Sequence, residues 1–411
     1  MAETLAINGG EPVRTRGFTG GNKVGAEELR ELVDVIFSGN MNRFGGGQKV
    51  DQFEAEFAEI HGAAHAVAST SGTSAIHVAI GMVNPSPGDE IITGPITDMG
   101  SITPILYQGA IPVFAECAAD TFNMDPADIE AKITDRTVAI MAIHLFGNPC
   151  EMAAIMEIAG RRGLPVIEDC SQAHLSEFDG RLVGTIGDIG CFSLQQSKHI
   201  TCGDGGITIT NNDEYGMRGR LFMDKGWHRA HYGPREYEVF GPNYRMNELS
   251  GAVALAQARK LRDIIARRRA AGDLLSELLA DNPNVTPQRL LEGCAHTYWQ
   301  YGMRVEEGAP FTADEFAAAV RAEGVSCGAH YIGRPIFLCH DALRNQRLFG
   351  DSSYPFDQAS HPVVYDDTTC PRTQEVLDRM VQPMCPTQFT PEDEVRDIAR
   401  AIRKVSEGLG A

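Results

Sequence analysis

The run Cys191-Phe192-Ser193-Leu194-Gln195-Gln196-Ser197-Lys198-His199-Ile200-Thr201-Cys202-Gly203-Asp204-Gly205-Gly206 lies near the middle of this 411-residue chain. It starts as an apolar strand, carries Lys198 five residues after Ser193, and ends in a glycine cluster before a second strand at Ile207–Thr210. The pattern predicts that Lys198 lies in a turn between two strands. Because most lysines are solvated surface charges, this placement makes Lys198 a candidate catalytic side chain.

A second apolar segment, Gly163–Ile167, ends in the carboxylates Glu168 and Asp169. We expect a parallel strand here, and open α/β sheets bind ligands at the carboxyl ends of such strands. A carboxylate at that edge, followed by a lysine, suits pyridoxal 5′-phosphate (PLP). The lysine forms a Schiff base with this cofactor, and the acid keeps the pyridine nitrogen protonated.

Strands and helices alternate over the first half of the chain. The predicted strands are His65–Ser69, Glu90–Thr93, Ile111–Ala115, Val138–His144 and Leu164–Glu168, and the predicted helices are residues 25–38, 48–61, 75–82 and 152–162. Such alternation predicts an α/β fold in which helices cover both faces of a mostly parallel sheet.

The second half of the chain predicts a smaller unit. A helical pattern runs from about Asn247 to Asp281, and it is followed by a strand at 298–305, a helix at 313–323 and a C-terminal helix at 391–408. We therefore expect an N-terminal arm (1–24), a large cofactor-binding domain (25–255) and a small α+β C-terminal domain (256–411), with the long helix as connector.

Composition excludes several classes of function. The net charge of −19 argues against nucleic-acid binding, which needs clustered Lys and Arg. No apolar run approaches the ~20 residues of a membrane span, and the first residues do not resemble a signal peptide. The ten cysteines lack metal-type spacing, so we expect reduced thiols and no metal site. These features predict a cytoplasmic protein that contacts neither nucleic acid nor membrane.

Four motifs resemble, in order and spacing, those of the DegT/DnrJ/EryC1/StrS family. They are Ser71-Gly72-Thr73-Ser74-Ala75, Glu168-Asp169-Cys170-Ser171-Gln172-Ala173-His174, Ser193 and Lys198 with Gly203-Asp204-Gly205-Gly206, and Asn243-Tyr244-Arg245-Met246-Asn247-Glu248. The resemblance spans about residues 5–405. It implies a fold-type I, PLP-dependent aminotransferase that acts on sugars or related cyclitols.

The first three motifs imply cofactor contacts. Ser71-Gly72-Thr73 follows a strand and opens a helix, so the free backbone N–H groups of the helix start point at one spot, where a phosphate could bind. A plain helix cap would explain the same residues. The resemblance assigns Gly72, Thr73 and Ser193 to the cofactor phosphate and Gln172 to the hydroxyl side of the ring. It assigns Asp169 to the ring nitrogen, although the residue alone could be a helix cap or an ion-pair partner.

The fourth motif implies a homodimer with shared active sites. Asn243 matches the family asparagine that reaches the cofactor phosphate of the neighbouring subunit. From the residues alone, an asparagine after Gly241-Pro242 is equally well explained as a turn residue.

Two positions depart from the family pattern. Asp204 stands in the glycine cluster where many relatives carry Glu. More seriously, Asp98 follows Thr97 where an aromatic side chain usually stacks on the pyridine ring. Either Met99 covers the ring as a polarizable substitute, or Asp98 turns toward substrate hydroxyls or an amine.

The reaction implied is a ping-pong transamination, in which Lys198 shuttles the proton and glutamine or glutamate donates the amino group. The run Gln195-Gln196-Ser197-Lys198 resembles members that act on keto-cyclitols such as scyllo-inosose, and amide side chains can bind a hydroxyl-rich ring. A keto-cyclitol or keto-sugar is therefore the expected acceptor.

Three alternatives stay open at this point. Sugar dehydratases of the family share most motifs but carry His in place of the lysine, so Lys198 disfavours them. An amino-hydroxybenzoate synthase shares a Gln before the lysine. A regulatory protein could also bind PLP without turnover.

Overall fold

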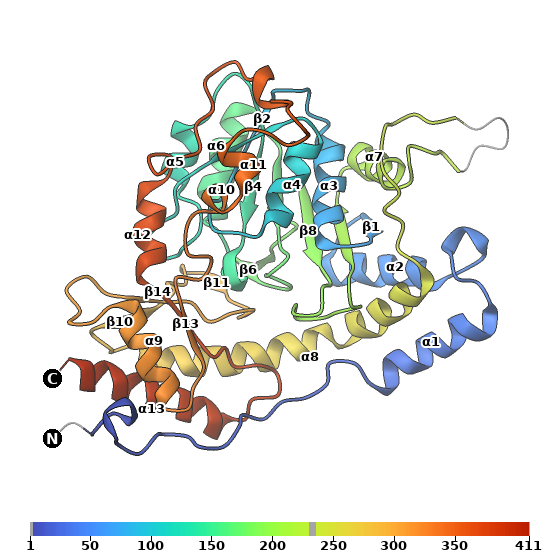
Figure 1. The fold of residues 1–411 in the computed structure, drawn as a ribbon. Coiled ribbons are helices and arrows are strands. Elements are labelled where there is room, and N and C mark those ends of the chain that lie inside the picture. Colours follow the sequence, from blue (N-terminus) through green and yellow to red (C-terminus); the bar gives the residue numbers. More distant parts are fainter. Residues whose placement is uncertain (1–2, 230–235, 411) are drawn as a thin grey trace.

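A seven-stranded sheet forms the centre of the fold, and the computed structural model describes residues 3–229 and 236–410 around it (Figure 1). The spatial order is β1-β9-β8-β5-β4-β2-β3. The strands are β1 (His65–Ser69), β2 (Glu90–Thr93), β3 (Ile111–Phe114), β4 (Thr137–Ile143), β5 (Val166–Asp169), β8 (Ile189–Ser193) and β9 (Gly206–Thr210). Only β9 runs against its neighbours within this sheet, which confirms the predicted mostly parallel α/β fold.

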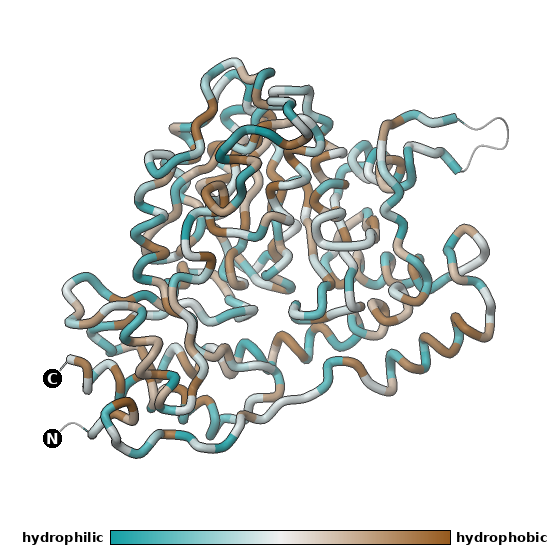
Figure 2. Tube along the Cα trace, in the orientation of Figure 1, coloured by the Kyte–Doolittle hydropathy of each residue, from teal (hydrophilic) through white to brown (hydrophobic). Residues whose placement is uncertain are grey.

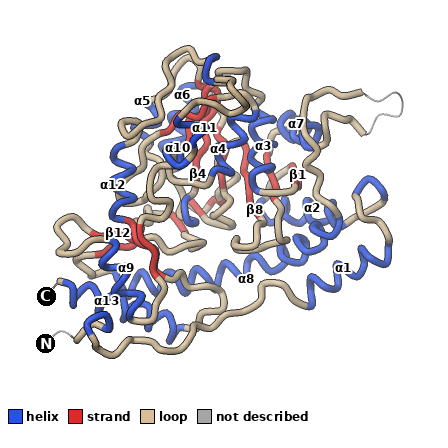
Figure 3. Tube along the Cα trace, in the orientation of Figure 1, coloured by secondary structure: helices blue, strands red, loops and turns tan. Residues whose placement is uncertain are grey.

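Helices cover both faces of this sheet (Figure 3). Because side chains alternate along a strand, Ala66 of β1 packs into a cluster with α2 and α6, whereas Val67 packs into a second cluster with α3 and α7. The helices that pack around this sheet are α2 (Lys49–His61), α3 (Gly72–Val83), α4 (Met99–Tyr107), α5 (Pro126–Ala131), α6 (Met152–Arg162) and α7 (Asp213–Met223).

The long helix α8 (Glu248–Leu279) joins two hydrophobic cores. Its first half, with Leu255 and Leu261, packs under the large sheet, and its second half, with Leu275 and Leu279, packs in a separate cluster. That cluster contains α9 (Ala313–Ala322), α13 (Glu392–Leu409) and an antiparallel sheet in the order β10 (Val285–Pro287), β12 (Met303–Val305), β14 (Met380–Pro383) and β13 (Cys327–Ala329). Both ends of the described chain lie beside this unit (Figure 1).

Residues 330–379 return to the large sheet. They contain α10 (Ile336–Cys339), α11 (Asp341–Arg344) and α12 (Pro371–Arg379), and Phe337 packs on Phe114 of β3 at the sheet edge. The remaining elements are α1 (Ala26–Ser38), the short helices η1 (Ala6–Asn8), η2 (Arg43–Gly45), η3 (Leu145–Gly147) and η4 (Phe356–Gln358), and the small sheet of β11 (Cys294–Ala295), β6 (Glu177–Phe178) and β7 (Arg181–Leu182).

The strand predicted at residues 298–305 is wrong in its first half. Only Met303–Val305 is a strand, because Tyr298 has a left-handed φ of 50° and the backbone N–H of Trp299 bonds to the carbonyl of Phe146 at 2.7 Å. This detour lets the Trp299 side chain contact the loop at Ser197. Among the described helices, none combines the length and the apolar character that crossing a membrane requires.

Candidate active site

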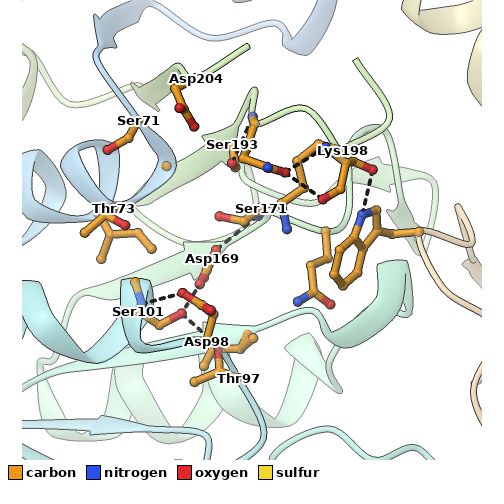
Figure 4. Close-up of a pocket in the computed structure, with 18 of the residues that line it drawn as sticks. Ser71, Thr73, Thr97, Asp98, Ser101, Asp169, Ser171, Ser193, Lys198 and Asp204 are labelled. Carbon is orange, nitrogen blue, oxygen red and sulfur yellow. Dashed lines mark hydrogen bonds between the residues drawn. The ribbon is translucent and has the colours of Figure 1, made fainter. Parts of the chain in front are cut away.

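Polar side chains from distant parts of the chain line a cavity of about 430 Å³ at the carboxyl ends of β4, β5 and β8 (Figure 4). Lys198, Asp169, Gly72, Thr73 and Ser193 all face it. The structure therefore brings together residues from three sequence motifs, of which Gly72 and Lys198 are 126 positions apart.

Lys198 lies in the irregular loop between β8 and β9, as predicted. Its Nζ lies 3.9 Å from the ring centroid of Trp299, and the Trp299 Nε1–H donates to the carbonyl oxygen of Ser197 at 3.0 Å. Burial lowers the pKa of Lys198, while the charges of Asp169 and Asp98 oppose this shift. The loop thus presents a partly desolvated amine to the cavity.

Asp169 ends β5 and is buried, with 3% of its surface exposed. Its carboxylate accepts hydrogen bonds from the Ser101 hydroxyl at 2.7 Å and from the Ser171 backbone N–H at 3.0 Å. The Ser101 oxygen lies 2.8 Å from the hydroxyl oxygen of Thr97. These contacts fix the carboxylate at the floor of the cavity (Figure 4).

Glu168 points to the opposite face of the sheet. Its carboxylate accepts from the backbone N–H groups of Ile186 and Gly187, and it pairs with the buried His144 at 3.0 Å. Because adjacent strand residues alternate between faces, only Asp169 of the two carboxylates reaches the cavity.

Helix α3 begins at the cavity wall. Ser71 caps it by accepting from the Ser74 N–H at 3.0 Å, and the N–H groups at the start of a helix lack partners within the helix. A Cβ atom added to Gly72 would lie 2.7 Å from the Cβ of Ser193. The absence of a side chain at Gly72 therefore lets the start of α3 approach the end of β8.

Gln172 also faces the cavity, and its Oε1 accepts from the backbone N–H of Phe146 at 2.7 Å. Tyr331 lies on the same wall, beside the Phe146 ring. Burial raises the pKa of Tyr331 to about 12, with hydrogen bonding to Gln172 acting in the opposite direction. The phenol is thus a neutral hydrogen-bonding group.

The two candidates for the ring face separate in the structure. Asp98 lines the cavity and caps α4 by accepting from the Gly100 N–H at 2.7 Å. Met99 packs instead among the apolar residues between α4 and α10, and it is not part of the cavity wall. The first residue of α4 projects away from the cavity, so the structure does not support Met99 as the ring cover. Asp204, the other position that departs from the family pattern, lines the same cavity.

Asn243 and Gln196 lie outside the cavity of their own chain. Asn243 is exposed, and its Oδ1 accepts from the Arg245 N–H at 3.4 Å. Gln196 is exposed as well, whereas Gln195 lines the cavity.

The sequence motifs assigned no role to several residues that line the cavity, among them Thr97, Ser101, Trp299 and Tyr331. Trp299 and Tyr331 come from the second half of the chain, and no local pattern marks them. Thr97 precedes the cap of α4 and Ser101 lies in the first turn of that helix, so helical spacing does not relate the two in the sequence.

A comparison with known families identifies the chain. Residues 22–403 match the model of the DegT/DnrJ/EryC1/StrS aminotransferase family. The chain belongs to this family. It is a PLP-dependent aminotransferase of the sugar and cyclitol group.

Relatives act on different acceptors, judging by their names. The chain is 34% identical over 430 residues to a putative L-glutamine:3-amino-2,3-dideoxy-scyllo-inosose aminotransferase of Micromonospora echinospora, covering 100% of this chain and 99% of the relative. It is 37% identical over 290 residues to the GDP-perosamine synthase of Escherichia coli O157:H7, covering 70% and 76%. The aminotransferase structure from Psychrobacter cryohalolentis superposes with a TM-score of 0.82 at 29% identity, covering 94% and 98%.

The residues present fit the cofactor. The cavity wall formed by Gly72 and Ser193, the free N–H groups of the first turn of α3 and the buried carboxylate of Asp169 match the needs of a phosphate at one end and a protonated ring nitrogen at the other.

Proposed function

We propose that this enzyme transfers an amino group from glutamine or glutamate to a ketone on a polyhydroxylated ring, a keto-cyclitol or keto-sugar, in amino-sugar, aminocyclitol or antibiotic biosynthesis. The charge of the cavity wall carries the proposal. Among the described residues that line it, Lys198 is the one basic side chain, whereas Asp98, Asp169 and Asp204 are acidic. Such a wall suits a neutral, hydroxyl-rich ring better than a sugar diphosphate, which needs cationic partners.

The residues that line the cavity suggest which of them contact each part of the cofactor. In this proposal the start of α3 at Gly72 and Thr73, together with the Ser193 hydroxyl, binds the phosphate. Asp169 binds the ring nitrogen, and Gln172 contacts the hydroxyl side of the ring. Bound there, PLP supplies an electron sink for the carbon that loses its proton.

Lys198 carries the proton transfer. Its Nζ would take the proton from the donor carbon and return it, in a 1,3-transfer, to the carbon on the cofactor side of the amino nitrogen. Burial favours the neutral amine by lowering the pKa of Lys198, and the Trp299 ring restricts where Nζ lies. A base that is partly desolvated and held in place suits this transfer.

Two polar groups are available for the acceptor. One oxygen of the Asp98 carboxylate accepts from Gly100, which leaves the second for a ring hydroxyl. The Gln195 Oε1 accepts from the N–H and the hydroxyl of Ser197, so its amide N–H groups remain as donors. Of the two glutamines before the lysine, we therefore assign substrate contact to Gln195.

We also propose a cytoplasmic homodimer in which Asn243 completes the partner's site. Helix α1 exposes Leu29, Ile36 and Phe37 at 61%, 61% and 87%, and Phe240, near Asn243 in sequence, is 99% exposed. Figure 2 shows hydrophobic residues along α1. An apolar face of this kind favours contact with a second copy.

The proposed acceptor is tested with purified enzyme and PLP on a panel of keto-cyclitols and nucleotide-linked keto-sugars, each with glutamine and with glutamate. We expect kcat/KM for the preferred keto-cyclitol to exceed that for the nucleotide-linked compounds by roughly 100-fold. Lys198→Ala should abolish turnover. Turnover of the nucleotide-linked compounds alone would overturn the cyclitol assignment.

A further inference from the structure

Lys23, in the N-terminal segment, contacts the loop that carries Lys198. Its ammonium donates to the carbonyl oxygen of Lys198 at 2.5 Å and to that of Gln196 at 3.1 Å. The two lysines are 175 positions apart in sequence. The contact therefore depends on the path of the N-terminal segment, which runs beside α8 (Figure 1).

Helix α8 anchors both partners of this contact. The backbone carbonyl of Lys23 accepts from the Gln257 side-chain amide at 2.7 Å and from the Lys260 ammonium at 3.1 Å. The buried Gln257 also accepts, through its Oε1, from the Thr201 N–H at 3.1 Å. Thr201 belongs to the loop between β8 and β9 that carries Lys198, which we call the catalytic loop. Arm, helix and loop are thus connected through one buried amide.

The charge of Lys23 has no acidic partner within the described residues, since none of the ion pairs there includes it. Burial lowers the pKa of Lys23 to about 8, and the nearby charges of Arg268 and Lys198 add to the shift. Desolvating an ammonium is costly unless strong acceptors replace water. Here the acceptors are the carbonyl groups of the catalytic loop itself.

We propose that Lys23 is a positioning residue for Lys198. Together with Trp299, which donates to the adjacent Ser197 carbonyl, it holds the loop backbone so that the Lys198 amine stays directed into the cavity. The inference rests on the proposed role of Lys198 as the reacting amine.

The test compares Lys23→Met with Lys260→Met. Lys260 contacts the same segment and the buried Glu28 of α1 but not the loop, so its variant controls for general loosening of the arm. Lys23→Arg keeps the charge and several donors. Circular dichroism and thermal melting check the folding of each variant, and Lys23→Gln replaces the methionine variant if that one does not fold.

Two readouts locate the effect. Hydrogen exchange of residues 194–205, measured without PLP, should increase in Lys23→Met and stay near wild type in Lys260→Met. The rate of the half-reaction with the amino donor should fall roughly 10- to 100-fold in Lys23→Met, with KM changed less than about threefold. Lys23→Arg should recover most of the rate.

Covalent trapping tests the role of Lys198 as the reacting amine separately from the positioning role of Lys23. PLP and borohydride should label Lys198 in the wild-type protein, and label elsewhere would overturn the role of Lys198. Labelling of Lys198, with wild-type exchange and half-reaction rates in Lys23→Met, would overturn the positioning role alone. Equal losses in Lys260→Met and Lys23→Met would also overturn it, because the arm as a whole would then be responsible.

Discussion

Glu168 and Asp169 show how one position in a strand determines the use of a carboxylate. Both are buried. The Glu168 oxygens bind two backbone N–H groups and His144, whereas the Asp169 carboxylate lies at the cavity and accepts a hydrogen bond from Ser101. The pair has the same chemistry and opposite surroundings. Only the cavity-facing member can interact with the cofactor ring.

Asp169→Asn should slow the half-reaction by roughly 100-fold or more, because an amide cannot hold the ring proton by charge. Ser101→Ala should slow it by roughly 10-fold, since losing a hydrogen bond to a charged group costs about 1.5 kcal/mol or more. PLP affinity should change modestly in both. Stopped-flow absorbance measures the rates, and Ser101→Thr should recover part of the loss.

Glu168→Gln is the matched control. We expect it to lower the thermal midpoint, because the buried contact with His144 weakens, and to leave the half-reaction nearly unchanged in protein that folds. Wild-type kinetics in Asp169→Asn would refute Asp169 as the partner of the ring nitrogen.

Residues carried by local motifs could be predicted from the sequence. Asp169 and Ser193 each end a strand, Lys198 lies in the loop after β8, and Thr73 lies in the first turn of α3; all four line one cavity in the structure. Trp299 and Tyr331 could not, because they reach the site through long-range contacts with Ser197 and Phe146. The sequence makes Met99 a candidate cover for the cofactor ring because it follows Asp98. In the structure it packs in the apolar cluster between α4 and α10 instead of facing the cavity.

Strands and helices with strong periodicity were predicted within a few residues. Strand β1 and helix α6 match their predicted bounds, while α3 starts three residues earlier than predicted because Ser71 is its cap. Residues 330–370 gave no clear pattern. Their short helices gain stability by packing Phe337 and Tyr365 against β3, and such tertiary contacts are not visible in local propensity.

The junction of α3 and β8 gives a prediction at the level of elements. Gly72→Ala should weaken PLP binding by roughly 10-fold, which corresponds to about 1.4 kcal/mol. The added Cβ, 2.7 Å from that of Ser193, has to push the start of α3 away from β8. Titration of the protein with PLP, followed by absorbance, measures the affinity.

Gly160→Ala provides the control within helix α6. An added Cβ there meets no atom within 4 Å, so this substitution should leave PLP affinity unchanged and raise stability by about 0.5–1 kcal/mol. If Gly72→Ala binds PLP as the wild type does, the start of α3 is not the phosphate site.

The whole molecule has features that a single chain does not explain. Helix α1 exposes an apolar face, and Asn243, which we propose as a cofactor contact, lies outside the cavity of its own chain. Both observations are expected if the working unit is a dimer in which each subunit lends Asn243 to its partner's site. Stability and activity would then both depend on association.

Mixing two inactive variants tests this arrangement. If Asn243 acts in the partner's site, a dimer of one Lys198→Ala chain and one Asn243→Ala chain contains one site with both substitutions and one intact site. Such mixed dimers should regain about half of the wild-type activity. If Asn243 acts in its own chain, each site keeps one substitution and no intact site forms. The assay therefore compares the mixture with the sum of the two parents, after Asn243→Ala alone has been shown to be impaired and subunit exchange has been confirmed by mass spectrometry. Activity equal to that sum would leave Asn243 as a turn residue of its own chain.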